Sequence, residues 1–321
     1  MKGALMEPKL LSIVVPLYKA PKILPVLYQR IVDSLSSWIN FEIILVNDSC
    51  PAGSEPEALK LAAQDARVKY IKLARNYGQH IAISAGLDHA RGDYAVVMDC
   101  DLQDQPEDIK NLYDALQEGA YDIVLGVRAA RKDSWLKRCL AALYRKIYRL
   151  LTKERIKKNH ANFSIITRKT IKSYRQFREQ KRSYSELLKC LTDNIGFIDV
   201  DHAQRYEGKS SYNFSKYISL GINYILFSSG RPLVFSIYAA GLLFMFAALF
   251  GVKLVWNYLV YSTAPTGWTS LMVAICFFSG LQMLFLGILG AYIGAIFDEA
   301  KRRPLYTVSD TMNIIHPISE E

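Results

Sequence analysis

The sequence predicts an α/β fold in which a mostly parallel sheet is followed by two apolar helices long enough to cross a membrane. Between residues 10 and 130, short β-branched runs alternate with helix-like segments, which is the pattern of a parallel sheet. Two later runs, Leu233–Val252 and Thr269–Phe297, contain no charged residue. With 321 residues, the chain has room for one large domain or two modest ones.

The first part of the chain predicts an ordered series of strands and crossover helices. Strands are expected at Leu10–Leu17, Phe41–Val46, Val68–Leu73, Tyr94–Met98 and Tyr121–Leu125. Helices are expected between them, at Pro25–Ser36, Glu55–Gln64, Ile81–His89 and Pro106–Glu118. Strands joined in this way run parallel, so their carboxyl ends meet at one edge of the sheet, where open α/β sheets bind ligands.

Each apolar run near the C-terminus meets the length of a membrane-spanning helix, with spans expected at 233–255 and 270–297. The alternative is a pair of buried core helices. The connection between the runs favours the membrane, because it is rich in the aromatic residues of a bilayer interface. These are Trp256, Tyr258, Tyr261 and Trp268.

Basic residues predict how this hairpin is oriented. Arg231 precedes the first span, and Lys301, Arg302 and Arg303 follow the second. By the positive-inside rule, both ends of the hairpin face the cytoplasm, although Lys253 lies on the other side. The early run Leu10–Leu17 is a strand and not a signal peptide, since it is short, contains a proline and lacks a cleavage pattern.

The net charge of +10 predicts anionic partners: nucleic acid, a nucleotide or a lipid headgroup. Residues 134–151 combine apolar residues at helical spacing with basic residues and no acid, which predicts an amphipathic helix at the membrane interface. The alternative is a helix packed on the sheet with a solvated basic face. Tyr212–Ser229 is expected to lead the chain along the membrane surface. The 5 cysteines show no metal-binding spacing, which indicates reduced thiols and no zinc site.

Polar residues follow four of the expected strands where each strand ends. Pro16 and Tyr18 end the first strand, and Asp48 follows the second. Asn76, Gly78 and Gln79 follow the third, and Asp99 and Asp101 follow the fourth. Two hard oxygen ligands one residue apart suit Mg²⁺ or Mn²⁺ carrying a diphosphate. The alternative is an acidic turn before a helix.

The motifs at these strand ends resemble those of a known family. They are Ser12-Ile-Val-Val-Pro16-x-Tyr18, Ile44-Leu-Val-Asn-Asp48-Ser49, Arg75-Asn76-x-Gly78-Gln79 and Asp99-Cys-Asp101-Leu-Gln103-Asp104-x-Pro106-Glu107. Together they resemble the polyprenyl-phosphate branch of the inverting family 2 glycosyltransferases, which includes dolichyl-phosphate mannose synthase and bacterial undecaprenyl-phosphate glucosyltransferases. The resemblance covers about residues 10–215, and the paired spans are similar to those of the bacterial members.

The resemblance implies a Rossmann-like GT-A catalytic domain over residues 1–210, a linker at 211–231, spans within 232–298 and a cytoplasmic tail at 299–321. It implies that Asp99, Asp101 and Gln103 hold the metal. It also implies that Asp48 contacts the nucleoside, with Pro16, Tyr18, Asn76, Gly78 and Gln79 in the same donor pocket. Arg128 matches a family arginine near the phosphates. Arg205 and Ser210 match a motif on the lipid-phosphate side, to which Arg138 is added. For Arg128 and Arg205 the alternative is an ordinary surface cation.

Two departures from the family pattern concern the acceptor side. Many relatives carry Gly-Asp-Phe-Arg where this chain has Ala161-Asn162-Phe163-Ser164, so a carboxylate often considered catalytic is an amide. Relatives often have Ser-Lys-Tyr where this chain has Ser210-Ser211-Tyr212. A sugar hydroxyl needs a base to attack, whereas a phosphate monoester is largely dianionic at neutral pH and is its own nucleophile. Asn162 is therefore compatible with a phosphate acceptor.

These observations predict a bacterial inner-membrane, multi-pass enzyme whose catalytic domain faces the cytoplasm. It would move a sugar from a nucleotide sugar, with UDP favoured, to undecaprenyl phosphate for cell-envelope glycan modification. Membrane lipids are expected partners, nucleic acid is not, and relatives suggest a homotetramer. Two alternatives stay open: transfer to a sugar hydroxyl, and a catalytically silent scaffold or flippase component. Against the second, both spans lack the charges of a polar translocation path. The sugar itself depends on pocket contacts that the sequence does not define.

Overall fold

The computed structural model describes residues 9–17, 21–49, 53–128, 160–180, 182–200, 231–261 and 267–314. The chain divides into two compact units. One contains a mixed sheet and its helices, and the other contains two long helices. The candidate site belongs to the first unit.

The described residues of the first unit form an eight-stranded sheet in the order β7-β5-β6-β4-β1-β2-β3-β8. In chain order the strands are β1 (Leu10–Leu17), β2 (Asn40–Asn47), β3 (Val68–Leu73), β4 (Tyr94–Val97), β5 (Ile123–Arg128), β6 (His160–Thr167), β7 (Ile195–Val200) and β8 (Val308–Met312). β1 pairs in parallel with β2 and β4, and β2 pairs in parallel with β3. β6 is antiparallel to both β4 and β5, and β8 is antiparallel to β3. The carboxyl ends of β1 to β4 therefore share one edge.

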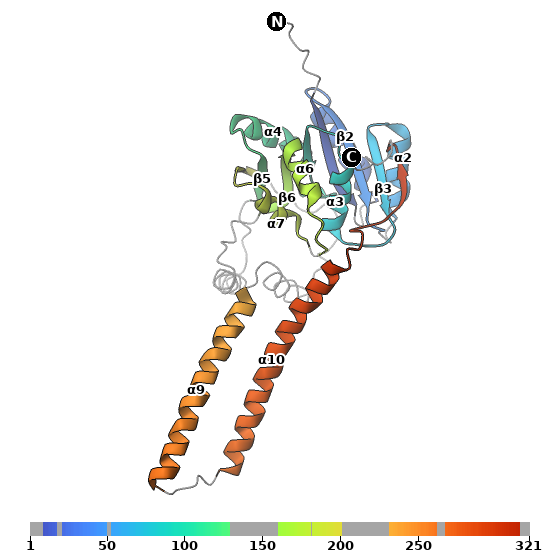
Figure 1. The fold of residues 1–321 in the computed structure, drawn as a ribbon. Helices are drawn as coiled ribbons and strands as arrows, with labels where there is room; N and C mark the ends of the chain where they lie inside the picture. The colour runs from blue at the N-terminus through green and yellow to red at the C-terminus, as the bar shows by residue number, and fades with distance from the viewer. Residues whose placement is uncertain are drawn as a thin grey trace. The chain divides into compact units, whose positions relative to one another are not determined.

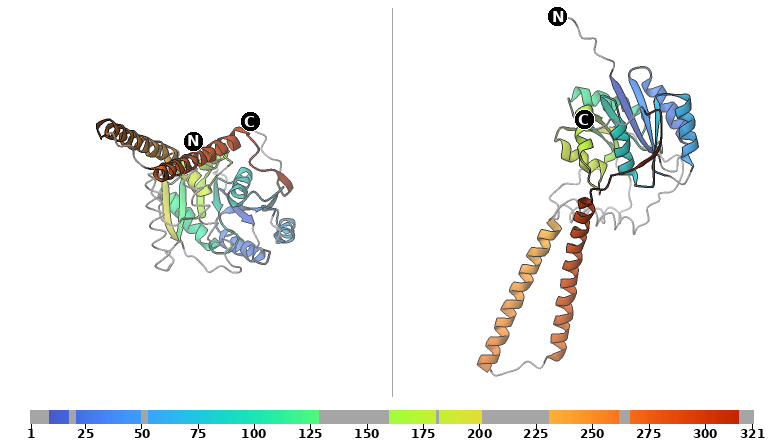
Figure 2. Two further views of the ribbon diagram at one scale, coloured as in Figure 1. Left: turned by 90° about the horizontal axis from the view of Figure 1, so that it is seen from below. Right: turned by 45° about the vertical axis from the view of Figure 1, so that its right-hand side comes forward.

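Helices cover both faces of this sheet (Figures 1 and 2). One apolar cluster packs α1 (Leu24–Leu35), α2 (Ser54–Gln64) and α4 (Ile109–Glu118) on one face, and α4 follows the short helix η1 (Pro106–Asp108). A second cluster packs α3 (Gln79–His89), α6 (Arg168–Gln176) and α7 (Tyr184–Leu191) on the other. Most residues of the strands between them are apolar on both faces, as a sheet covered on both sides requires.

The structure confirms the first four expected strands and their crossover helices, with ends within two residues of the prediction. The fifth strand lies further along the chain than expected, at Ile123–Arg128, because Gly119 and Ala120 end α4 and Tyr121 lies in the connection. β6, β7 and β8 were not expected. The predicted helix at 134–151 and the segment 212–229 lie outside the described residues.

Part of the segment expected as a cytoplasmic tail forms β8 of the sheet, which the sequence did not reveal, and its cytoplasmic location stays a prediction. Within it, β8 pairs with β3 along Tyr70 to Leu73 and covers that edge strand. Thr307, just before β8, accepts the backbone N–H of Ala74 at 2.9 Å through its carbonyl oxygen. Its hydroxyl lies 2.7 Å from the hydroxyl of Tyr77. The tail therefore braces the loop that leaves β3 and leads to α3.

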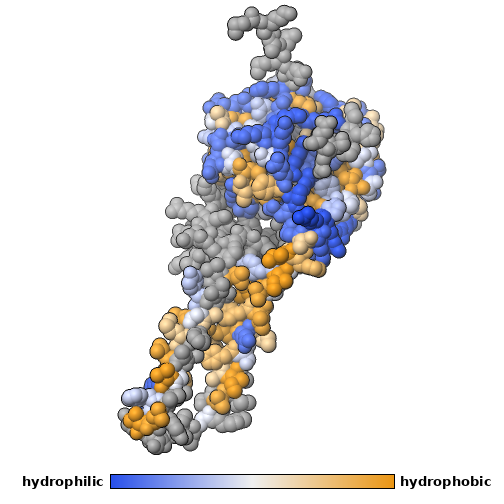
Figure 3. Space-filling model, in the orientation of Figure 1, coloured by the Kyte–Doolittle hydropathy of each residue, from blue (hydrophilic) through white to orange (hydrophobic). Residues whose placement is uncertain are grey.

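The second unit contains α9 (Arg231–Tyr261) and α10 (Trp268–Ala300), which run in opposite directions in Figures 1 and 2. Large apolar side chains on both helices are exposed, among them Leu242, Phe246, Leu249, Phe277 and Ile296. Figure 3 shows the resulting apolar surface. Within the described residues, one stretch, Val273–Ala300, is long and apolar enough to cross a membrane, with a mean hydropathy of 2.1.

Gly86 allows α3 to pack directly on the sheet. A Cβ atom at Gly86 would lie 2.3 Å from Cγ1 of Val14 and 3.2 Å from Cγ2 of Val46. We expect Gly86→Ala to lower the free energy of unfolding by about 1–3 kcal/mol, because overpacking outweighs the helix propensity gained. Thermal unfolding of the full-length protein in detergent measures this. Gly280→Ala is the control, since its Cβ would meet nothing within 4 Å. An unchanged unfolding temperature for Gly86→Ala would contradict the expected clash.

Candidate active site at the carboxyl edge of the sheet

Strand register brings several of the predicted site residues to one edge. Pro16 pairs with Val46, and Val14 pairs with Val97, so the residues that follow β2 and β4 flank the end of β1. The backbone N–H of Met98 continues this register by donating to the carbonyl of Val14 at 3.1 Å. Asp48 and Asp99 are thus placed on either side of Pro16, as the parallel sheet predicted.

Asp48 fixes the loop after β3. It is buried, and its two carboxylate oxygens accept the backbone N–H groups of Tyr77 and Gly78, each at 2.7 Å. Burial raises the pKa of Asp48 above its usual value, and the two N–H groups oppose that rise. Gly78 has φ of 96°, a conformation that a side chain disfavours. Asp48 therefore holds the start of α3 against the end of β2.

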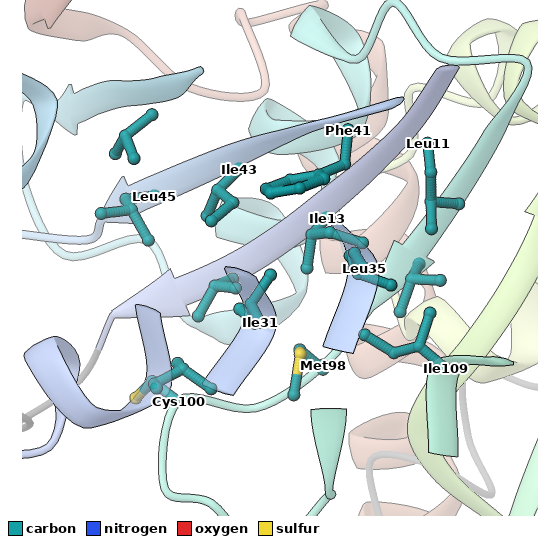
Figure 4. Packing of buried hydrophobic residues seen from close by; sticks show 14 of the residues in the cluster. Leu11, Ile13, Ile31, Leu35, Phe41, Ile43, Leu45, Met98, Cys100 and Ile109 are labelled. Atoms are coloured by element: carbon teal, nitrogen blue, oxygen red, sulfur yellow. The ribbon is translucent and has the colours of Figure 1, made fainter. Parts of the chain in front are cut away.

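The acidic turn after β4 is anchored by alternate side chains. Met98, Cys100 and Leu102 are buried, and Met98 and Cys100 lie in the apolar cluster shown in Figure 4. Asp99 and Asp101, between them, are partly exposed. Leu102 has φ of 58°, which is rare for a leucine and marks a constrained turn. The core thus holds the turn while its two carboxylates stay accessible.

Hydrogen bonds link this turn to the neighbouring loop. The Gln79 side chain at the start of α3 donates from Nε2 to Oδ1 of Asp99 at 2.6 Å. The backbone N–H of Gln103 donates to Oδ1 of Asp101 at 3.2 Å. Gln79 therefore joins the loops after β3 and β4, and Gln103 supports the turn through its backbone.

β6 adds Asn162 to the same edge. Val97 pairs with Ser164, and extending this antiparallel register by two residues places Asn162 level with Asp99. The hydroxyl of Ser164 donates to the carbonyl oxygen of Asn162 at 2.9 Å and lies 2.8 Å from the hydroxyl of Tyr184. The register therefore brings the amide that replaces a family carboxylate to the same edge of the sheet as the acidic turn, which sequence spacing alone did not reveal.

The donor groups in this turn fit a divalent cation. Asp99 and Asp101 supply carboxylate oxygens one residue apart and partly exposed, and Gln103 adds an amide. Hard cations such as Mg²⁺ and Mn²⁺ prefer oxygen ligands and commonly bind through one or two carboxylates together with a substrate phosphate. In the described part of the chain, no group of three or more His, Cys, Asp and Glu side chains gathers into a metal site. The predicted set has two carboxylates, so the substrate would complete it.

The structure therefore brings together Pro16, Asp48, Gly78, Gln79, Asp99, Asp101 and Asn162. Asn76 is exposed in the loop between β3 and α3. Arg128 ends β5, whose carboxyl end lies at this same edge, but its side chain is outside the described residues. Tyr18, Arg138, Arg205 and Ser210 also lie outside them.

Sequence patterns did not single out His80, Arg182 or Tyr184, which lie next to this edge. The Nδ1 atom of His80 accepts the backbone N–H of Tyr184 at 3.3 Å. Burial, and then the positive charge of Arg182, lower the pKa of His80, so its ring is neutral at pH 7. The contact between His80 and Tyr184 joins the start of α3 to the start of α7 across about a hundred residues, so no local sequence motif contains both.

Comparisons with known proteins show the family of this chain. The family model for glycosyl transferase family 2 matches residues 12–176. An uncharacterized glycosyltransferase of Synechocystis sp. is 32% identical over 302 residues, which cover 94% of this chain and 95% of that protein. A prophage bactoprenol glucosyl transferase homolog of Escherichia coli is 30% identical, over 93% of this chain and 98% of that protein.

A further relative carries a different named activity, and a solved structure shares the fold. The undecaprenyl-phosphate 4-deoxy-4-formamido-L-arabinose transferase of Shewanella sediminis is 33% identical, over 94% of this chain and 92% of that protein. Glucosyl-3-phosphoglycerate synthase of Mycobacterium tuberculosis, solved with Mn²⁺, UDP-glucose and phosphoglyceric acid, matches with a TM-score of 0.50. The match covers 70% of this chain and 79% of that chain at 14% identity, and it shows the fold alone. The GT-A fold is confirmed, and the chain belongs to glycosyltransferase family 2.

Proposed function

We propose that this enzyme transfers a sugar from a nucleotide sugar to undecaprenyl phosphate or a similar polyprenyl phosphate, with inversion at the anomeric carbon. The names of its relatives from Escherichia coli and Shewanella sediminis, which are similar over nearly their whole lengths, support this acceptor class. The observation that carries the proposal is Asn162, which lies level with Asp99 and offers an amide where a base would otherwise lie.

The donor side of the proposal rests on Asp48 and the acidic turn. Asp48, held by two backbone N–H groups, would accept hydrogen bonds from the nucleoside. Asp99 and Asp101 would hold Mg²⁺ or Mn²⁺, which when bound neutralises the diphosphate and stabilises the leaving group. Gln79 would keep the Asp99 carboxylate oriented. A UDP-sugar is the favoured donor, as the resemblance to family members with paired C-terminal spans implies.

The acceptor side needs cations more than a base. An oxygen of the lipid phosphate attacks the anomeric carbon, the bond to the donor diphosphate breaks, and the nucleoside diphosphate leaves with the bonding electrons. The phosphate has no proton to lose when dianionic, so no carboxylate is required at position 162. Arg128, Arg138 and Arg205, with Ser210, are proposed to guide the lipid phosphate to the donor.

We also propose that α9 crosses the membrane together with α10. α9 has 31 residues, and its exposed side chains are largely apolar, as in Leu242, Phe246 and Leu249. Arg231 at its start and the basic residues after α10 would place both ends in the cytoplasm. The enzyme would then meet a lipid phosphate in the inner leaflet of a bacterial cytoplasmic membrane, and its nucleotide sugar in the cytoplasm.

The test incubates the full-length protein in detergent with undecaprenyl phosphate, Mg²⁺ and one nucleotide sugar at a time. Mass spectrometry is expected to show lipid heavier by one glycosyl residue with at least one donor. The competing function, transfer to a sugar hydroxyl, is tested in parallel with a lipid-linked glycan acceptor. Product with the glycan acceptor and none with undecaprenyl phosphate would overturn the proposal.

A substitution at Asn162 separates the two acceptor classes further. We expect Asn162→Ala to keep the initial rate with undecaprenyl phosphate within about 10-fold, because no base is lost. Removal of a working general base costs about 10²- to 10⁴-fold. Initial rates at saturating donor measure this, with wild-type protein beside the variant. A loss of more than about 100-fold, in a variant that unfolds at the wild-type temperature, would show that the side chain takes part in the chemistry.

A further inference from the structure

Arg182 has a buried guanidinium group without an ionic partner in the described part of the chain. It lies in the connection between α6 and α7, and its Nε, Nη1 and Nη2 atoms are buried and make no hydrogen bond there. The guanidinium carbon lies 4.9 Å from the centre of the Tyr174 ring, in a cation–π contact. A buried charge without hydrogen-bond partners is costly, and one ring face offsets only part of that cost.

The side chains around Arg182 are neutral and bonded to one another. The hydroxyl of Tyr174 lies 3.0 Å from that of Ser84, and the hydroxyl of Tyr184 lies 2.8 Å from that of Ser164. Burial raises the pKa of both tyrosines, which keeps them protonated. His80 is neutral for the reasons given above. None of these groups supplies the anion that a guanidinium pairs with.

The nearby carboxylate of Asp88 is already engaged. Its Oδ2 atom accepts the hydroxyl of Tyr306 at 2.7 Å and Nη1 of Arg178 at 2.8 Å. Asp88 thus ties the C-terminal segment to the loop after α6, and Arg182 lies further along that loop. Within the described residues, no ion pair of a carboxylate with Arg182 is seen, which leaves its guanidinium available to an anionic ligand.

Arg182 is also close to the candidate site through its neighbours. Tyr184, two residues later, connects through Ser164 to Asn162 on the acceptor side. On the other side its backbone N–H contacts His80, which follows Gln79, the partner of Asp99. These contacts place the start of α7 between the residue that replaces the family carboxylate and the residue that orients the acidic turn.

We propose that Arg182 binds a phosphate group of the substrates, and that this is the phosphate monoester of the lipid acceptor, an inference that rests on the proposed function. The planar guanidinium pairs with two phosphate oxygens at once, which a lysine ammonium does not match. The residue as a whole is partly exposed although its guanidinium atoms are buried, so a ligand would meet the guanidinium once the long side chain turns away from Tyr174. The donor diphosphate shares this chemistry, and the link through Tyr184 to Asn162 favours the acceptor.

Steady-state kinetics of the full-length protein in detergent distinguish the two phosphate sources. For Arg182→Met we expect the KM for undecaprenyl phosphate to rise about 10- to 100-fold, with the KM for the nucleotide sugar within about 3-fold of wild type. For Arg182→Lys, the KM for undecaprenyl phosphate is expected to lie between the values of the wild type and Arg182→Met. Arg178→Met, in the same loop but paired with Asp88, is the matched control and should change neither KM. A rise in the donor KM alone would overturn the assignment to the acceptor.

Thermal unfolding supplies a readout that needs no turnover. Without ligand, Arg182→Met is expected to unfold at or above the wild-type temperature, because a buried unpaired charge has been removed. Undecaprenyl phosphate should stabilise the wild type and stabilise the variant much less. A variant that unfolds earlier and keeps both KM values would show a purely structural role for Arg182. If wild-type protein makes no product yet gains Arg182-dependent stability from undecaprenyl phosphate, the proposed reaction fails while this binding site stands.

Discussion

Replacing Asp99 or Asp101 by asparagine is expected to lower kcat by at least about 100- to 1,000-fold, the size of effect seen when one group that stabilises developing charge is removed. Both carboxylates are partly exposed at the carboxyl edge of the sheet, and the residues on either side of each in the chain are buried in the core. Asparagine keeps the shape of the turn but removes the negative charge that would attract a divalent cation. Initial rates at saturating donor and acceptor measure the loss.

Two controls show whether the loss is specific. Asp114→Asn removes an exposed carboxylate on α4 that pairs with Lys110, and it should leave the rate unchanged. Gln79→Ala removes the hydrogen bond that orients Asp99 and is expected to cost about 10- to 100-fold, as is typical for groups that support a metal ligand. Calorimetric titration of donor with and without Mn²⁺ adds a binding measurement. Wild-type rates in both Asp99→Asn and Asp101→Asn would exclude a metal role for this turn.

Asp48→Asn is expected to raise the KM for the nucleotide sugar by about 10- to 100-fold, with a smaller effect on the KM for the lipid. Each Asp48 oxygen accepts one backbone N–H, from Tyr77 and from Gly78. An asparagine offers only one oxygen, so its amide N–H₂ would face one of these donors and release part of the loop. The substitution would then lose both the proposed nucleoside contact and the positioning of α3.

The pH dependence of donor binding gives a second test of Asp48. Because burial raises its pKa, the carboxyl group takes up a proton at a higher pH than an ordinary aspartate does. As the pH falls through that raised pKa, the neutral carboxyl comes to resemble an amide. The difference in donor affinity between wild type and Asp48→Asn should therefore shrink toward acid pH. A difference that stays constant with pH would show that the charge of Asp48 is not used.

Local patterns predicted the parallel half of the fold well. The strands β1 to β4 are short apolar runs, and the helices α1 and α2 between them have amphipathic spacing, so period and composition identify these elements. Because consecutive crossovers are right-handed and make strands parallel, the shared edge follows from chain order. The polar residues at the strand ends then had to meet, which is why Asp48, Gln79 and Asp99 could be placed together from sequence.

The strands β6 and β8 escaped prediction because their pairing is non-local. β6 begins with polar residues and lies between β4 and β5, and this antiparallel insertion alone places Asn162 level with Asp99. β8 is short, and most of its residues are exposed, so it has no strand pattern of its own. Its position depends on the unpaired edge of β3, which lies more than 200 residues earlier in the chain.

The burial of charged residues also could not be predicted from the local sequence. Glu42 and Lys69 occupy neighbouring strands and pair in the interior, where Glu42 also accepts the hydroxyl of Ser12 at 2.6 Å. Each residue alone reads as a polar interruption of a strand. Arg182 likewise reads as a surface cation until α6 and α7 enclose its guanidinium against Tyr174.

The sequence by itself determined the parallel α/β core, the carboxylates at its edge, the apolar helices and the family. These features depend on periodicity and on motifs within a few residues, and such signals survive without knowledge of the fold. Tertiary structure alone decided that β6 brings Asn162 to the edge that carries the acidic turn, that β8 joins the sheet, and that the guanidinium of Arg182 is buried against Tyr174. Each of these depends on contacts between distant segments, whose energies arise only when the chain has packed.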